Sequence, residues 1–517
     1  MRLFFLISCV ITAVTGMFTV TRQAHMLQQN SYFPSRYLNW LRSSFSFKSA
    51  VFCGVLFAEI LLFVLKLYVP LFILSILSLP LCAYGAVNGQ KKAIKKLVFT
   101  ARVKRQYFSL FIIYAVLCLL AAFVSDAFFI AIAALCFLPC VSVLLVRTLN
   151  TPAEKAVTHY YINDAKRILK QHGDLTVIGI TGSYGKTSTK YILASLLEQK
   201  YNVVYTPASF NTPMGVVRTI RESIRPETQI FIAEMGAKNI GDIKEICDIV
   251  NPHIGIITSV GPQHLDTFKS IDNVLSTKFE LADSVLSTEG KVFLNNDNEY
   301  INKKATAISC VTYGKSADVS YSNVSYGEDG ACFTINGYNE IVNIKTKLLG
   351  MHNVQNLAGA ASVALYLGVN PSDIAYAAAK LKPVEHRLQL KTFLRGALLI
   401  DDAYNANPEG SLEAVRVLGS MAGRRKVIVT PGLIELGERE YECNFALGEA
   451  AAGVCDEIIL VGKKRSEPLL DGVKKADYKG EISVVASFAE ALEKLKATAN
   501  NNTAVLIEND LPDNYLK

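Results

Sequence analysis

The first 150 of the 517 residues are dominated by Leu, Phe, Ile, Val and Ala, and this composition then changes abruptly. Each apolar stretch in this part approaches the roughly 20 residues that an α-helix needs to cross a hydrocarbon core. The sequence therefore predicts a transmembrane region over 1–150, followed by a mixed globular part. About five spans are expected, at roughly 3–20, 50–67, 69–88, 107–125 and 127–147.

Lysine and arginine concentrate in the polar segments on one side of these spans. The segment 90–106 carries many cations and no acid, and the segment 22–48 is also cationic. Because loops rich in Lys and Arg stay in the cytoplasm, both segments should be cytoplasmic. Five crossings then place the N-terminus and the turn at Ser125-Asp126 outside, and everything after Arg147 inside. The sequence predicts a multi-pass protein of the cell membrane, with membrane lipid as a partner.

Charge and cysteine content argue against two other classes of protein. The net charge of +8 is modest, and the densest basic run lies between apolar segments, so no nucleic acid is expected as a partner. The eleven cysteines lack the paired CxxC spacing of a zinc ribbon or a redox centre. We expect reduced, structural thiols, as in an enzyme that faces the cytosol.

Glu59 lies inside the second apolar segment, where an unpaired carboxylate is costly. Its side chain could line a polar site, reach the membrane surface, or pair with a neighbour such as Lys66. The sequence leaves these alternatives open.

A glycine-rich turn, ITGSYGKTS at 180–188, lies between a buried strand expected over 175–180 and a helix expected over 187–200. It is two residues shorter than the usual P-loop, G-x-x-x-x-G-K-[ST]. A helix N-terminus after such a turn binds phosphate through backbone N–H groups. Lys186 would reach the terminal phosphates and Thr187 would ligate Mg²⁺. The pattern predicts a nucleotide site for ATP.

Two further strands are expected to end in groups that bind metal. The stretch 229–237 reads as a buried strand that ends in Glu234, and 253–268 contains a strand that ends near His264. Ligands bind at the carboxyl edge of parallel sheets, so these side chains should gather near Lys186. The sequence therefore predicts a site for a nucleotide and a metal.

From about residue 389 four short apolar strands alternate with helices. This pattern predicts a smaller Rossmann-like unit. The expected protein is multi-domain, with an α-helical transmembrane region, an α/β P-loop ATPase domain and a C-terminal α/β Rossmann-like domain. The expected boundaries are 1–150, 151–388 and 389–517.

Together these motifs resemble the Mur ligases, ATP-dependent enzymes that build the peptide of bacterial cell-wall precursors. The family's own short phosphate loop reads T-G-S-x-G-K-T-S, and the resemblance extends from about residue 170 to the end. DDAYNANP followed by IELGE is most similar to the MurF branch, which adds D-alanyl-D-alanine to a UDP-muramoyl tripeptide. The matching motifs are ITGSYGKTS (180–188), SFNTPMGV (209–216), AEMGA (233–237), HLDTF (264–268), LGMHNVQN (349–356), EHRLQ (385–389), DDAYNANP (401–408) and IELGERE (434–440).

The resemblance implies a role for each matching position. The residues implied to bind ATP are Gly182, Ser183, Gly185, Lys186, Thr187, Ser188, Asn295, His352, Asn353, Asn356, Arg387 and Asp402. Of these, Arg387 and Asp402 would come from the third domain to bind phosphate and ribose. The residues implied to shape the acceptor site are Asn211, Thr212, Asn405 and Asn407.

The resemblance also implies two Mg²⁺ ions and a modified lysine. Thr187 and Glu234 would hold one ion, and His264 would hold the second. Lys278 lies fourteen residues after His264, the spacing at which family members carry a carbamylated lysine. A carbamate is an anionic oxygen ligand of the kind that Mg²⁺ prefers. Lys186, His264 and Lys278 would then form the catalytic set, although Lys278 could also be an ordinary surface lysine.

The implied reaction activates a substrate carboxylate as an acyl phosphate, which an amine then attacks with loss of phosphate. The Mg²⁺ ions and Lys186 neutralise charge on the transferring group, and no side chain serves as a covalent nucleophile.

The chain departs from the family at both ends. Membrane helices stand where the family has a domain for the UDP-sugar, and LIENDLPDNY (506–515) stands where MurF enzymes usually carry a Lys-x-Ser-Arg stretch. The acyl substrate is therefore expected to be a UDP- or lipid-linked muramoyl peptide, and the amine a D-amino acid or dipeptide. Membrane-bound cell-wall enzymes are possible partners. A tethered ligase for another γ-linked or capsule-type polymer, and a scaffold with an inactive ligase domain, remain alternatives.

Overall fold

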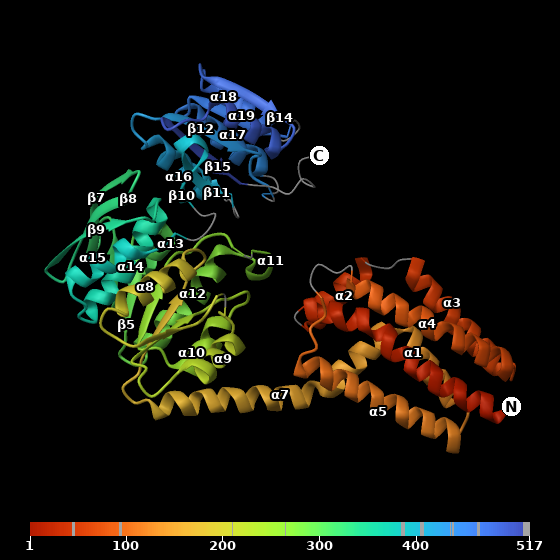
Figure 1. The fold of residues 1–517 in the computed structure, drawn as a ribbon. Helices are drawn as coiled ribbons and strands as arrows, with labels where there is room; N and C mark the ends of the chain where they lie inside the picture. Colours follow the sequence, from red (N-terminus) through yellow and green to blue (C-terminus); the bar gives the residue numbers. More distant parts are fainter. Residues whose placement is uncertain are drawn as a thin grey trace. The chain divides into compact units, whose positions relative to one another are not determined.

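The chain forms two compact units, Met1–Tyr161 and Ile162–Lys517 (Figure 1). The boundary lies inside a long helix, about ten residues beyond the expected end of the helical region. The structure is a computed structural model that describes residues 1–30, 32–43, 47–91, 96–208, 210–263, 265–383, 388–403, 408–434, 436, 439–462 and 466–509.

The first unit is entirely helical in its described part. Helix α1 packs against α4, α5 and α6, and its buried face includes Phe5, Thr12 and Leu27. Helix α7 continues past the boundary of the unit and contains Pro152. The helices are α1 (Arg2–Gln29), α2 (Pro34–Ser43), α3 (Phe47–Val64), α4 (Tyr68–Lys91), α5 (Ala101–Phe123), α6 (Phe128–Phe137) and α7 (Pro139–Gln171).

Fewer described helices have the length and composition of a membrane span than the sequence predicts. By length and composition, α1, α4 and α5 qualify, and α6 and α7 qualify only as a pair bent by 101°. Helix α3 contributes a shorter apolar segment, Ala50–Val64. By length and composition the described residues thus offer three candidate spans, or up to four, and the expectation of about five spans stays a prediction.

The bend explains why the expected span 127–147 is not one straight helix. Helix α6 ends at Phe137, and Leu138 leaves the helical region with φ −111° and ψ 62°. The α conformation is disfavoured for a residue that precedes proline, so the helix ends before Pro139. Proline is well tolerated in the first turn of a helix, and Pro139 begins α7. The proline therefore breaks the apolar run that hydropathy alone reads as continuous.

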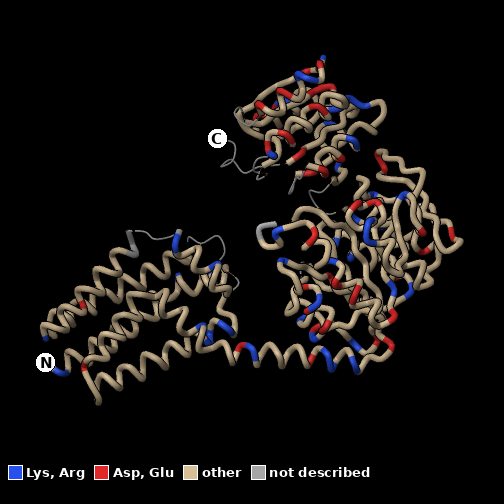
Figure 2. The backbone as a smooth tube through the Cα atoms, turned by 180° about the vertical axis from the view of Figure 1, so that it is seen from behind, with Lys and Arg blue, Asp and Glu red and all other residues tan. Residues whose placement is uncertain are grey.

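The two ends of the helical unit differ in charge. At one end the Arg2 guanidinium donates to the Ala122 carbonyl at 2.9 Å, beside the predicted turn at 125–126. At the other end the Gln28 amide exchanges two hydrogen bonds with the Val98 backbone, at 2.8 and 3.0 Å. Most Lys and Arg of this unit lie toward that second end, where α7 continues (Figure 2). The structure thus gathers the cations on one side, as the orientation prediction requires.

The second unit contains a nine-stranded sheet in the order β2-β3-β1-β4-β5-β6-β7-β8-β9. Its first seven strands in this order run parallel, and β7, β8 and β9 pair antiparallel. The strands are β1 (Thr176–Thr181), β2 (Val203–Tyr205), β3 (Ile230–Glu234), β4 (Ile254–Ile257), β5 (Lys291–Asn295), β6 (Val311–Gly314), β7 (Val319–Gly327), β8 (Gly330–Gly337) and β9 (Glu340–Thr346). The predicted strands β1 and β3 are confirmed, and β4 is confirmed as a strand, although it ends at Ile257, well before His264, and not near that residue as predicted.

Helices cover this sheet in two groups. Helices α8 and α14 pack on each other over one apolar core that includes Ile178 and Ile180 of β1. Helices α10 and α12 pack together and against β1. Parallel strands buried on both faces read as continuous apolar runs, which is why the sequence identified them. The helices are α8 (Lys186–Leu197), α9 (Pro213–Ser223), α10 (Asp242–Val250), α11 (Leu265–Phe268), α12 (Ile271–Leu286), α13 (Glu299–Ala305), α14 (Met351–Tyr366) and α15 (Pro371–Lys380).

The rest of the second unit is built on a six-stranded sheet in the order β10-β11-β15-β12-β13-β14. Only β10 runs antiparallel to its neighbour, so the sheet is a mixed, mostly parallel one, in an α/β unit as predicted. The strands are β10 (Gln389–Thr392), β11 (Leu398–Asp402), β12 (Arg425–Thr430), β13 (Glu457–Val461), β14 (Glu481–Val485) and β15 (Thr503–Glu508). The helices are α16 (Pro408–Gly419), α17 (Glu440–Ala452), α18 (Glu467–Lys475) and α19 (Phe488–Thr498), with a 3₁₀ turn at Leu394–Gly396.

Candidate nucleotide and metal site

The glycine-rich turn joins β1 to α8, as predicted. Gly185 has φ 80° and precedes the helix, where no side chain caps the first N–H groups. Those N–H groups are the ones that bind anions at helix N-termini. Gly182 lies so close to β4 that an added Cβ would lie 2.1 Å from Thr258 Oγ1. The local backbone is therefore compatible with the predicted phosphate loop.

Lys186 folds back over this loop. Its ammonium donates to the carbonyl of Gly182 at 2.5 Å and to that of Ser183 at 3.0 Å. Burial lowers the pKa of Lys186, and the nearby Glu234 carboxylate opposes that shift. A phosphate bound to the loop would compete with these carbonyls for the ammonium.

Glu234, at the end of β3, is buried, and both of its carboxylate oxygens accept hydrogen bonds. Its two oxygens accept from Thr187 Oγ1 at 3.1 and 3.0 Å, and Oε1 also accepts from Asn211 Nδ2 at 3.1 Å. The ammonium of Lys190 donates to Oε2 at 3.0 Å and to the Ala208 carbonyl at 2.7 Å. The structure brings together the predicted Thr187, Glu234 and Asn211.

Lys190 is the residue that sequence reasoning missed. Its side chain has no exposed surface and forms a buried ion pair with Glu234. It follows Lys186 by four residues, so both lie on the same face of α8. That spacing was a signal in the sequence, although a second lysine on a helix is usually solvent-exposed.

Lys278 lies on α12 with only 2% of its surface exposed. Burial, and then the positive charge of Lys186, lower its pKa to about 7. Among the described residues no hydrogen bond or ion pair holds its amine. The alternative of an ordinary surface lysine is therefore wrong, and much of the amine is neutral near pH 7.

The oxygen donors of Thr187 and Glu234 fit a magnesium ion, because Mg²⁺ prefers carboxylate and hydroxyl oxygens. No group of three or more His, Cys, Asp and Glu side chains in the described part of the chain could hold a metal. A metal site here would thus depend on Thr187, on a modified Lys278, or on His264, which lies outside the described residues.

Comparison with known proteins shows to which family this architecture belongs. The Mur ligase middle domain matches residues 180–364, and the Mur ligase glutamate ligase domain matches residues 386–508. The UDP-N-acetylmuramoyl-tripeptide--D-alanyl-D-alanine ligase of Mycobacterium leprae is 32% identical over 369 residues, which cover 65% of this chain and 71% of that protein. The chain belongs to the Mur ligase family.

Other relatives of this Mur ligase have the same description. The ligase of Bacillus subtilis is 29% identical, over 66% of this chain and 75% of its own length. The ligase of Mycobacterium tuberculosis is 35% identical, over 57% of this chain and 60% of its own length. The alignments to curated relatives thus leave a quarter or more of each relative's length unmatched.

Solved MurF structures are similar as well. A crystal structure of MurF from Acinetobacter baumannii superposes with a TM-score of 0.58 at 26% identity, over 68% of this chain and 77% of that one. MurF from Thermotoga maritima, in complex with ADP, gives a TM-score of 0.57 at 26% identity, over 68% and 80%.

Several other predicted residues of this Mur ligase have structural partners. The Ser183 hydroxyl donates to the Gly261 carbonyl at 3.1 Å, and the Asn295 amide donates to the Thr258 carbonyl at 2.8 Å. The first contact ties the glycine-rich loop, and the second ties the end of β5, to the residues that follow β4. Thr212 caps α9 by accepting from the Gly215 N–H at 3.3 Å.

The predicted adenine-side residues lie on the first turns of α14. Asn356 accepts from Thr189 on α8 at 3.1 Å, and its Oδ1 would lie 2.5 Å from a Cβ at Gly185. Asn353 donates to the Leu349 carbonyl at 2.8 Å, and His352 lies against Gly350. Asn356 therefore touches the phosphate loop itself.

Not every predicted residue can be placed. Ser188 is half-buried in the first turn of α8. Asp402 ends β11, and its carboxylate accepts from the Leu388 N–H at 3.0 Å. The predicted His264, Arg387, Asn405 and Asn407 lie outside the described residues.

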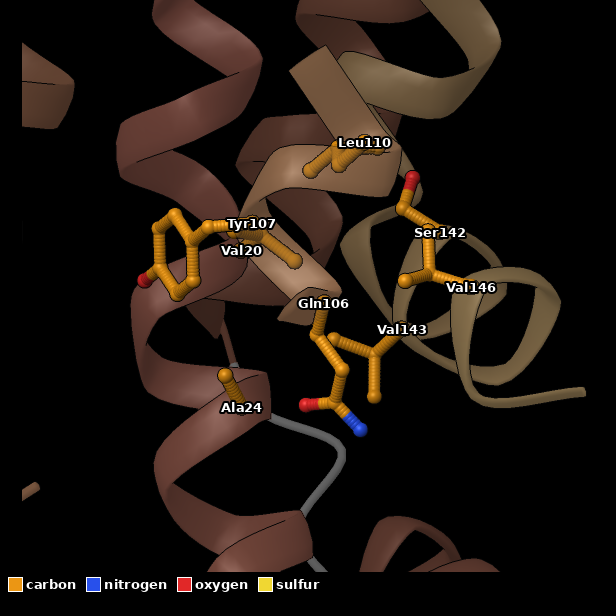
Figure 3. A pocket seen from close by; sticks show the side chains of 8 residues that line it. All are labelled: Val20, Ala24, Gln106, Tyr107, Leu110, Ser142, Val143 and Val146. Carbon is orange, nitrogen blue, oxygen red and sulfur yellow. The ribbon is translucent and has the colours of Figure 1, made fainter. Parts of the chain in front are cut away.

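A small cavity in the helical unit does not offer a second site. It lies between α1, α5 and α7 and has about 10 Å³ for the centre of a water-sized molecule, which is about the space for one water (Figure 3). Its walls are mostly apolar, apart from Gln106, Tyr107 and Ser142. It is too small for a lipid or a sugar.

Proposed function

We propose that this chain is a membrane-anchored, MurF-type ligase that joins D-alanyl-D-alanine or a D-amino acid to the peptide of a muramoyl precursor. The observation that carries the proposal is the convergence of Lys186, Thr187, Glu234 and Lys278 around one phosphate loop. Its relatives of known description are ligases of this type.

In the proposed reaction the loop N–H groups and Lys186 bind the β- and γ-phosphates of ATP. The substrate carboxylate takes the γ-phosphoryl group, which gives an acyl phosphate and ADP. The amine then attacks the acyl carbon, the C–O bond to phosphate breaks, and the amine proton leaves to solvent. Bound at Thr187, Glu234 and His264, Mg²⁺ would supply charge neutralisation for the transferring group.

Lys278 is suited to carbamylation. Only a neutral amine attacks CO₂, and the lowered pKa of about 7 provides that form near neutral pH. The C–N bond forms, the amine loses a proton, and the cation becomes an anion. The anion would relieve the repulsion from Lys186 and supply oxygen atoms to a metal.

The helical unit is proposed as the membrane anchor. It contains three helices of spanning length and composition, and cations at one end. Lys and Arg near an anionic surface contribute about 1 kcal/mol each to membrane attraction. Tethering raises the effective concentration of a membrane-bound partner. We therefore propose a cytoplasmic ligase on a multi-pass membrane anchor, with a lipid-linked precursor, or one passed on by a membrane-bound cell-wall enzyme, as acyl substrate.

The substrate is tested with the purified full-length protein in detergent or lipid nanodiscs. A UDP-linked muramoyl peptide and its lipid-linked counterpart are offered side by side, with ATP, Mg²⁺ and D-alanyl-D-alanine, and phosphate release and the amide product are measured. We expect amide formation with faster turnover of the lipid-linked form. Faster turnover of the UDP form, unchanged on deletion of residues 1–150, would leave a tethered ligase for a soluble precursor. If ATP is turned over with neither substrate, the result would favour the alternative of a membrane scaffold with an inactive ligase domain.

The orientation is tested by cysteine labelling in intact cells, in a background without the native cysteines. A cysteine at Asp126 should react with an impermeant thiol reagent, whereas one at Lys96 should react only after lysis. The reverse pattern would place the ATP site outside and overturn the proposal.

A further inference from the structure

A hydrogen bond joins helix α16 to the first residue of helix α14. Helix α14 packs on the nine-stranded sheet, whereas α16 packs on the six-stranded sheet (Figure 1). The carboxylate of Glu413, on α16, accepts from the backbone N–H of Met351, which begins α14, at 2.7 Å. A side chain from the layer of one sheet therefore caps a helix that belongs to the other sheet.

Helix α14 has no side-chain cap from the residue before it. That residue is Gly350, which has φ 87° and offers no side-chain acceptor. The first N–H groups of a helix need acceptors from elsewhere, and a negative charge at this end also suits the helix dipole. Glu413 supplies both the acceptor and the charge. Its side chain is only 12% exposed, so the hydrogen bond is mostly shielded from water.

Neighbouring contacts hold Glu413 where it meets α14. Its Oε1 also accepts from the Tyr326 hydroxyl at 3.5 Å, and its Oε2 pairs with the Arg416 guanidinium at 3.4 Å. Leu349, just before α14, belongs to the same buried apolar cluster as Ala414 of α16. The capping contact is thus supported by apolar packing on the same seam between the two sheets.

The first turn of α14 matters because of the residues that it carries. His352 and Asn353, two of the predicted adenine-side residues, follow Met351 directly. Asn356 lies one turn later and contacts Thr189 and the phosphate loop. A loss of order in the first turn should therefore disturb the adenine side of the site and leave the phosphate side intact.

We propose that Glu413 is a positioning residue for the nucleotide, because it caps α14 from the other sheet and keeps the first turn of that helix in the conformation that receives the adenine. The proposal rests on the proposed function, in which α14 carries the adenine-side residues. When a binding turn is ordered for only a fraction of the time, the affinity falls by that fraction. Glu413 lies beyond DDAYNANP (401–408) and belongs to none of the motifs that match the family.

The test uses the full-length protein in detergent. Glu413→Gln keeps an oxygen that accepts the N–H, whereas Glu413→Leu keeps a similar volume without an acceptor. Glu328→Leu is the matched control, because Glu328 is another carboxylate on this seam and its ion pair in the described part of the chain is with Arg424 at 2.7 Å, not with α14. Equilibrium affinities for ADP and for tripolyphosphate, which has no base, are measured for each variant, together with thermal unfolding.

Loss of one hydrogen bond to a charged group should make Glu413→Leu bind ADP about tenfold more weakly, with little change for tripolyphosphate. Glu413→Gln, with a neutral acceptor, should bind ADP within about threefold of the wild type. Glu328→Leu should bind ADP as the wild type does. Glu413→Asp, whose carboxylate is one methylene shorter, should lose ADP affinity by less than Glu413→Leu, and it serves if Glu413→Leu does not fold.

The affinity of the wild type for ADP tests the nucleotide site itself, whereas the differences between variants test Glu413, so the two proposals can fail separately. Wild-type ADP affinity in Glu413→Leu, or equal losses in Glu413→Leu and Glu413→Gln, would overturn the role of Glu413. Equal losses for ADP and tripolyphosphate would overturn it as well, because they would indicate a general loss of structure.

Discussion

Glu234 in the α/β unit and Glu59 in the helical unit are both almost completely buried, with 1% and 0% of their surface exposed. Glu234 is bound by Thr187, Lys190 and Asn211, whereas neither oxygen of Glu59 has a hydrogen-bond partner in the described part of the chain. The hydroxyls of Thr12 and Ser75 lie next to Glu59 but bond to each other at 3.3 Å. Burial alone thus does not define a site, whereas the set of partners does.

The comparison also settles two of the alternatives for Glu59. No described ion pair joins it to Lys66, and its side chain is buried rather than extended to a surface. A buried carboxylate without a partner is expensive, so we expect Glu59 to be a neutral acid, whereas Glu234 has the ammonium of Lys190 beside it. Four substitutions test this difference, from the largest expected effect to the smallest.

Lys190→Met should have the largest effect on stability. It leaves the buried Glu234 without its cation, and breaking a buried ion pair costs about 3–5 kcal/mol. The free energy of unfolding, measured by denaturant titration, should fall by that amount. Lys303→Met removes an exposed helical ion pair and is the control, with a much smaller expected loss. Equal losses in the two variants would show that the buried ion pair with Glu234 contributes no more to stability than an exposed ion pair does.

Lys186→Ala should reduce acyl phosphate formation at least about a hundredfold, because it removes one preorganised charge from the transferring phosphoryl group. The fold should survive, since in the described part of the chain the ammonium bonds only to carbonyls of its own loop. The measurement is ADP release in single-turnover conditions, with the circular dichroism spectrum as control. A folded variant with normal turnover would contradict the phosphate-loop assignment.

Lys278→Met should stabilise the protein while it abolishes activity. The pKa of this lysine is about 7 in the folded chain against 10.5 for the free side chain, so between these values the unfolded state binds more protons and stability rises with pH. Below pH 7 the buried lysine is mostly charged, so the full cost of burying that charge destabilises the folded state. In CO₂-free buffer at pH 6 the variant should gain about 1–4 kcal/mol over the wild type, and at pH 9 less.

The gain should disappear in excess bicarbonate if the wild-type lysine is carbamylated. Acetate should partly restore activity to Lys278→Ala by supplying the missing carboxylate. A variant that retains wild-type activity would exclude a role for Lys278 in the reaction.

Glu59→Gln should have the smallest effect. A neutral amide replaces an acid that is already neutral, so the expected change in unfolding free energy is within about 1 kcal/mol. Glu234→Gln is the matched change in the α/β unit, and it should remove most ligase activity. A Glu59→Gln protein that fails to fold or loses ligase activity would show that the helical unit depends on this carboxyl group.

Local patterns in the sequence were sufficient to predict much of the fold. The strands β1, β3 and β4 are continuous apolar runs, and the glycine spacing before Lys186 requires a tight turn followed by a helix. Thr187 and Glu234 follow from the rule that parallel strands end at one edge. These features depend on neighbours along the chain, so the sequence determined them by itself.

The tertiary structure decided which of these residues are buried together. Lys190 looks like any exposed helical lysine until β3 places Glu234 beside it, and Lys278 looks like a surface residue until the sheet covers it. The break before Pro139 divides the last expected apolar segment between α6 and α7, which are bent by 101°. The pairing of Asp402 with Glu508 joins residues more than a hundred positions apart. Partners this distant in the chain share no local periodicity, so only packing brings them together.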